Sequence, residues 1–160
     1  MSDHMNHISR YRRLLLPGLM AAAMAACGVP DVEYSEYHNI PPQGWVYGDS
    51  IFFTPEHYNS LCNGRFVVAV RHDTSYPFTD LWLELTTMDV DRHQHRDTLH
   101  FPLTDRHGNW VGHGIAASFQ LTDTSRVVEH ATGLPVSVRH IMRTDTLRGV
   151  NQVGLFFVPK

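Results

Sequence analysis

The sequence predicts an all-β protein, an antiparallel β-sandwich of the jelly-roll or immunoglobulin-like type. Apolar residues recur at every second position in several short segments, which is the spacing of a strand with one buried face. Turn-forming residues separate these segments, and no stretch longer than about ten residues shows the periodicity of an amphipathic helix. Roughly eight short strands at such spacing are typical of an antiparallel sandwich or a small barrel.

The expected strands follow one another from residue 66 to the end of the chain. The first is a continuous apolar run, Phe66 to Val70, which indicates a central strand covered on both faces. The later strands alternate apolar and polar residues, and their apolar positions are Leu81, Leu83 and Leu85; Leu99, Phe101 and Leu103; Ile115, Ala117, Phe119 and Leu121; Val136 and Val138; and Val153, Leu155 and Phe157. The predicted core includes Phe66, Val68, Leu83, Phe101, Phe119, Val138 and Leu155.

Residues that favour turns lie between the expected strands. Such turns are expected at Asn63-Gly64, Asp73 to Pro77, Asp105 to Asn109, Thr132-Gly133 and Gly149. Two further glycines, Gly112 and Gly114, are expected to let backbone or an aromatic ring approach closely.

Composition excludes several classes of protein. The chain has 160 residues, of which 42% are apolar, and includes 8 Phe, 6 Tyr and 3 Trp. That is enough for one packed domain and is unlike a disordered chain. There are 13 Lys and Arg against 16 Asp and Glu, so no basic stripe for nucleic acid is expected. Two cysteines without a CxxC motif do not indicate a disulfide scaffold or a cysteine zinc site.

The N-terminal segment has the pattern of a secretory signal peptide. Arg10, Arg12 and Arg13 precede an apolar run, Leu14 to Ala26, of 13 residues, which is too short to span a bilayer. The run ends in Met24-Ala25-Ala26-Cys27, which resembles the lipobox of bacterial lipoproteins. We therefore expect cleavage between Ala26 and Cys27 and acylation, including palmitate, at Cys27. The alternative is an ordinary signal peptide with a cysteine there by chance.

The chain is expected to comprise three parts: a lipoprotein signal peptide over 1–26, an acylated tether over 27–36 and a β-sandwich domain over 37–160. Cleavage removes three arginines and Asp3, so the mature chain carries 10 Lys and Arg against 15 Asp and Glu, a net charge of −5. Acyl chains would hold it at a membrane. Gly28 rather than Asp follows the cysteine, which in lipoprotein sorting permits delivery to the outer membrane, with either a periplasmic or a surface-facing domain.

Histidines are abundant, 12 in all, but a metal site is not predicted. His93 and His95 could share one face of a strand, with His100 and His107 nearby. The stretch from Asp89 to Asp97 is polar and resembles a connection between strands, so solvated loop histidines are the favoured interpretation and no metal or other cofactor is expected.

Catalytic signatures are also missing from the sequence. There is no GxSxG motif, and Ser, His and Asp are scattered. Cys62 lacks the electropositive surroundings of a reactive thiol and is expected to be half-buried and inert. Asp89 and Asp91 could serve as an acid–base pair, but acidic loop residues are common. The protein is therefore expected not to be an enzyme.

Two tryptophans could form a sugar-stacking platform, because exposed aromatic faces on sheets suit that task. For Trp110 we favour a structural role across a sheet edge, with Gly112 and Gly114 leaving it room. Trp82 alternates with buried leucines and is expected on the outer or half-covered face. It is our candidate partner surface.

Several blocks of residues follow the lipobox in order. They are Tyr37, Trp45 and Phe52; Arg71 with Tyr76 to Leu83; Asp97 to Leu99 with Asp105 and Gly108 to Gly114; and His140 to Arg143 with Leu147 to Val150 and Val153 to Leu155. Taken together with the lipobox, these blocks resemble the gliding-motility lipoprotein GldH family, and the resemblance runs from Cys27 to Val158. Phe78 and Asp80 depart from the Tyr and Asn of the family pattern. Arg71 and Arg143 could pair with Asp80 or Asp145, or face solvent.

This resemblance implies an outer-membrane lipoprotein of the cell envelope that acts without catalysis in gliding motility and type IX secretion, as an accessory or assembly component. Its partners would be other envelope proteins of that apparatus, and the resemblance carries over no catalytic residue. The alternative is a surface lipoprotein that binds a glycan or another ligand through Trp82.

Overall fold

The computed structural model describes residues 32, 34–55, 62–89, 91–115, 117–130 and 134–160. The expected signal peptide, Ala26, Cys27 and the turn at Thr132-Gly133 lie outside these residues. The strands are β1 (Tyr34–Asn39), β2 (Trp45–Val46), β3 (Ile51–Phe53), β4 (Cys62–Asp73), β5 (Asp80–Met88), β6 (Gln94–Pro102), β7 (His113–Ile115), β8 (Ser118–His130), β9 (Val136–His140), β10 (Thr146–Leu147) and β11 (Val150–Pro159). Within the described residues, no helix has the length and apolarity to span a membrane.

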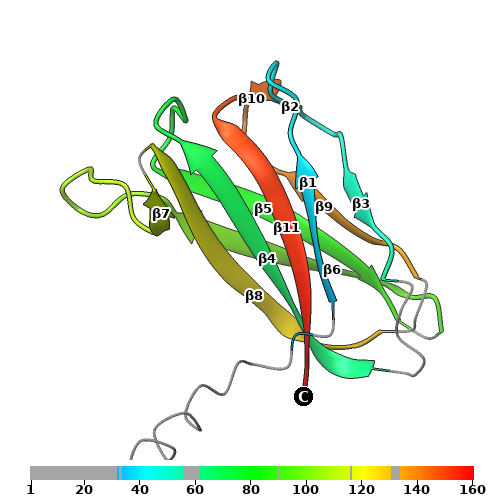
Figure 1. The fold of residues 1–160 in the computed structure, drawn as a ribbon. Coiled ribbons are helices and arrows are strands. Elements are labelled where there is room, and N and C mark those ends of the chain that lie inside the picture. The colour runs from blue at the N-terminus through cyan, green and yellow to red at the C-terminus, as the bar shows by residue number, and fades with distance from the viewer. Residues whose placement is uncertain (1–31, 33, 56–61, 90, 116, 131–133) are drawn as a thin grey trace, which may run out of the picture. The chain divides into compact units, whose positions relative to one another are not determined.

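Two antiparallel sheets face each other, as Figure 1 shows. One has five strands in the order β1-β11-β4-β8-β7, and the other has four in the order β3-β9-β5-β6. A two-stranded sheet, β10-β2, pairs Leu147 with Trp45. The prediction of an all-β antiparallel sandwich is confirmed.

The connections give the sandwich a jelly-roll topology. When the short strands β2, β7 and β10 are set aside, successive strands lie in opposite sheets, except that the β5–β6 hairpin stays within one. Strand β1 pairs with β11 from Tyr34 onward, so pairing begins three residues before the domain start expected at residue 37.

The core lies between the sheets and is built by period-two alternation. Leu81, Leu83 and Leu85 of β5 point inward and are at most 1% exposed. Six of the seven predicted core residues are buried: Phe66, Val68, Leu83, Phe101, Val138 and Leu155. The seventh, Phe119, is only partly buried, because it packs at the margin of the core against His72 and Trp110.

Two sequence predictions about strand limits are wrong. Residues 115–121 do not form one strand, because the chain reverses between Ile115 and Ser118, which pair across the β7–β8 hairpin. Asn63-Gly64 is not a turn but lies inside β4. A Cβ atom at Gly64 would lie 2.4 Å from the Phe157 ring and 2.5 Å from the Val158 carbonyl oxygen, so this glycine permits close packing within the sheet.

Carboxylates bridge β6, at the edge of the four-stranded sheet, and the part of β8 that lies beyond its short pairing with β7. Asp97 of β6 accepts hydrogen bonds from the backbone N–H and the Nε of Arg126 on β8. In the opposite direction, Asp123 of β8 accepts the backbone N–H of His100 on β6 at 3.0 Å. Because unpaired edge groups invite association with other chains, these side chains protect both edges.

Candidate functional site

Trp82 lies on the outer face of the four-stranded sheet. Its neighbours Leu81 and Leu83 point into the core, so the alternation of β5 turns Trp82 outward, and its side chain remains 41% exposed. The sequence prediction of an outer or half-covered position is confirmed.

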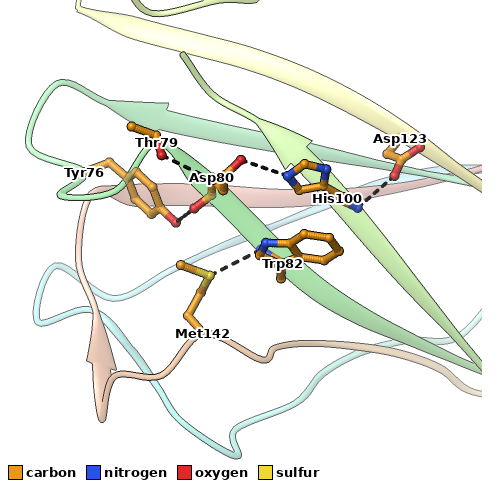
Figure 2. Close-up of polar contacts among 7 residues, drawn as sticks. All are labelled: Tyr76, Thr79, Asp80, Trp82, His100, Asp123 and Met142. Atoms are coloured by element: carbon orange, nitrogen blue, oxygen red, sulfur yellow. Dashed lines mark hydrogen bonds and ion pairs between the residues drawn. The ribbon is translucent and has the colours of Figure 1, made fainter. Parts of the chain in front are cut away.

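The indole of Trp82 stacks on the imidazole of His100, its cross-strand partner on β6. The ring centroids are 4.0 Å apart and the planes meet at 14°. Asp80 holds the imidazole through a contact of 2.8 Å between its Oδ1 and the Nε2 of His100 (Figure 2). We call Asp80, Trp82 and His100 the Trp82 surface.

The backbone beneath this surface is held from several sides. Ile141 N–H donates to the Trp82 carbonyl at 3.0 Å, and the Trp82 N–H donates to the Met142 sulfur at 3.4 Å. The Tyr76 hydroxyl donates to the Asp80 carbonyl at 2.8 Å (Figure 2). Burial raises the pKa of Tyr76, and Asp80 adds to the effect, so this hydroxyl keeps its proton. The Trp82 surface is therefore positioned before any partner arrives.

The same sheet face carries a charged pair beside the Trp82 surface. Arg139 of β9 donates from Nε to Glu84 of β5 at 2.8 Å, and this hydrogen bond raises the pKa of Arg139. Farther across the sheet, Phe52 of β3 is 61% exposed. This arrangement offers aromatic contact area with polar groups at its margin, which suits recognition of a partner.

The histidines singled out in the sequence are dispersed. His93 and His95 both contact Asp89, at 3.4 and 3.0 Å, and the hydrogen bond with His95 lowers the pKa of Asp89. His100 belongs to the Trp82 surface, and His107 lies in a turn around Asp105. In the part of the chain that the structure describes, no three His, Cys, Asp or Glu side chains are grouped as a metal site would require.

The other residues considered from the sequence are Asp89 with Asp91, Cys62 and Trp110. Asp89, proposed with Asp91 as an acid–base pair, is engaged by the two histidines. Cys62 begins β4, but its side chain is outside the described residues. Trp110 is partly buried against the core, which confirms its structural role. The space left by Gly112 and Gly114 is occupied by the backbone of β8 and the Leu121 side chain rather than by Trp110.

Of the alternatives left open for Arg71, pairing with a carboxylate is not found within the described residues. Its guanidinium donates to Gln120 and Gln152 instead, while Asp80 contacts His100. For Arg143, no ion pair is present within the described residues.

Sequence reasoning missed two buried histidines. His72 and His140 are both 0% exposed, and burial lowers the pKa of each. His72 donates from Nδ1 to the Asp73 carbonyl, and His140 donates from Nε2 to the Trp45 carbonyl. The signal was present, because each histidine continues an inward-facing alternation, Phe66-Val68-Val70-His72 and Val136-Val138-His140.

Comparison with known proteins gives one family. A family model described as GldH lipoprotein matches residues 32–156, which include most of the described strands. No curated protein matches the chain.

Proposed function

The chain belongs to the GldH lipoprotein family, and we propose that it is a non-enzymatic accessory or assembly component of the gliding-motility and type IX secretion apparatus. Membership of a lipoprotein family makes it a membrane-anchored protein of the cell envelope. We further propose that Cys27 carries the acyl anchor and that the outer membrane is its destination. The family match is the main observation that supports this proposal.

The Trp82 surface is the proposed contact for an envelope protein. An indole that is 41% exposed and already stacked on His100 loses little conformational entropy on binding. Aromatic residues on rigid elements are typical interface anchors. Membrane anchoring raises the local concentration of membrane-bound partners, so a modest interface can be occupied. The mature charge of −5 opposes adsorption to anionic lipid and favours a protein partner.

A non-enzymatic role is supported by the contacts of the titratable groups. The described residues with shifted pKa values serve structural contacts: His72 and His140 lie in the core, Tyr76 holds the start of β5, Asp73, Asp89 and Asp105 hold turns, and Arg139 pairs with Glu84 across the sheet. An active site would bring such groups together in a cleft.

The test is a crosslinked pull-down of the tagged protein from intact cells. We expect wild type to recover envelope proteins of the gliding and secretion apparatus, and W82A to recover markedly less. H93A and H95A are matched surface controls, because they lie at the far end of the β5–β6 hairpin, where His95 pairs with Thr87, about 17 Å along β5 from Trp82. Equal recovery by W82A and the controls, with unchanged thermal stability, would refute the role of Trp82.

The second candidate function is glycan binding at the same surface. Its supporting observation is the exposed, stacked indole beside the polar groups of Asp80 and His100. Tight binding of a purified oligosaccharide that is lost in W82A, together with recovery of no envelope protein, would favour this candidate over the first.

A further inference from the structure

A row of polar side chains crosses the outer face of the five-stranded sheet, on the opposite side of the sandwich from Trp82. Each strand contributes one residue at a paired register position, and the order across the sheet is Asn39, Gln152, Arg71, Gln120 and His113. Arg71 of the central strand β4 is the only one of the five with a permanent charge.

Hydrogen bonds hold Arg71 in a single orientation. Its Nε donates to the Gln120 Oε1 at 2.7 Å, and its Nη1 donates to the Gln152 Oε1 at 2.6 Å. Gln152 in turn donates to Asn39 at 2.6 Å. The guanidinium carbon lies 4.4 Å from the ring centroid of Tyr37, a cation–π contact. The guanidinium is therefore preorganised by neutral groups alone.

The positive charge of Arg71 has no counter-ion within the described residues, where no carboxylate oxygen lies within 4.0 Å of the guanidinium nitrogens. Asp73, two residues along the same strand face, binds the N–H and hydroxyl of Ser75 instead. No hydrogen bond from Nη2 of Arg71 to a described residue is present. This half-buried cation thus keeps donors for an external anion.

A cavity of about 380 Å³ opens beside Arg71 and is lined by Arg71, His113, Ser118, Gln120, Asn151 and Gln152, with Gly114 at its wall. Its volume falls within the range of about 300–1,000 Å³ typical of small-molecule sites. Strand β7 forms this wall because Gly114 allows close approach. A Cβ atom there would lie 1.7 Å from the Ser118 carbonyl oxygen.

We propose that this cavity binds an acidic sugar of the uronate type, with the sugar carboxylate on Arg71 and its hydroxyls on the surrounding amides and Ser118. The side chains that line the cavity favour this class of ligand. Arg71 is the one permanently charged side chain among its described lining residues, and a planar guanidinium can bind a carboxylate through two parallel hydrogen bonds. Among its described lining residues there is no carboxylate that would bind an ammonium group and no apolar side chain that would bind an apolar acid.

The test is a binding titration of the full-length protein in detergent with glucuronate, glucose and inorganic phosphate. We expect glucuronate to bind at least about tenfold more tightly than either of the other two. The decisive variant is Q120E, which is nearly isosteric and places a carboxylate where an amide oxygen already accepts the Arg71 Nε. It supplies the missing counter-ion, so glucuronate affinity should fall at least about tenfold while the melting temperature stays the same or rises.

W82A is the matched control, because Trp82 lies on the other sheet, and it should bind glucuronate like wild type. This control also separates the inference from the function proposed for the Trp82 surface. Absence of glucuronate binding to wild type, or equal binding to Q120E, would overturn the proposal. Phosphate binding as tight as glucuronate would overturn the assignment to an acidic sugar, and loss of binding in W82A would overturn the location.

Discussion

Acid should destabilise the fold through the two histidines that the sandwich buries in the neutral form. Burial lowers the pKa of His72 and His140. This outweighs the opposing effect of Asp73 on His72, and of the Trp45 and Val46 backbone and Asp49 on His140. Arg139 adds to the lowering at His140. The buried His72 Nε2 and His140 Nδ1 have no hydrogen-bond partner among the residues that the structure describes, so protonation would create an unpaired buried donor as well as a charge.

The sign and size of the effect follow from proton linkage. An imidazole in the unfolded chain titrates near about pH 6.5. At pH values between the lower folded pKa and this unfolded value, the unfolded state binds more protons than the folded state. The stability contributed by each histidine is therefore fully present above about pH 6.5 and is lost as the pH falls. Each histidine can lower the free energy of unfolding by at most about 1.4 kcal/mol per pH unit, and the two together by about 2.7 kcal/mol per pH unit. A typical domain is stable by only about 5–15 kcal/mol, so the loss is measurable.

Urea unfolding between about pH 8 and pH 5 tests this reasoning. H72L removes one titrating group and sacrifices one hydrogen bond, from Nδ1 to the Asp73 carbonyl at 3.2 Å. The variant should therefore lose less stability than wild type on acidification, by up to about 1.4 kcal/mol per pH unit. The control is H93Q, at a side chain that is 74% exposed, which should keep the wild-type slope. If H72L and H140L both keep that slope as well, the two histidines do not cause the acid sensitivity.

Three further predictions concern the anchor, the histidines near Asp89 and the packing of β4. Labelled palmitate should enter the protein through Cys27, and C27S should abolish the label; equal labelling of C27S would exclude this anchor. Chelators should leave the melting temperature unchanged, whereas a drop of many degrees would indicate a structural metal. G64A should lower the free energy of unfolding by about 1–3 kcal/mol in urea, because its methyl group would meet the Phe157 ring and the Val158 carbonyl; wild-type stability would contradict that packing.

Much of the fold could be predicted from local pattern, because burial of one sheet face imposes a period of two on the sequence. That rule located β5, β6, β9 and β11 and turned Trp82 outward between Leu81 and Leu83. It failed where the pattern continued across a chain reversal, between Ile115 and Ser118, because a periodicity carries no information on where a strand turns back. It could also have assigned His72 and His140 to the core, but the polarity of histidine obscured the signal.

The sequence by itself determined that the chain would form an antiparallel all-β domain, which residues would fill most of its core and which tryptophan would face outward. Only the tertiary structure decided which strands became neighbours, and with them the partners of Arg71, which lie 49 and 81 residues away in the sequence. The physical reason is that side-chain alternation is a local property of one strand. Hydrogen bonds across a sheet depend instead on strand order and register, which the packing of the whole domain selects.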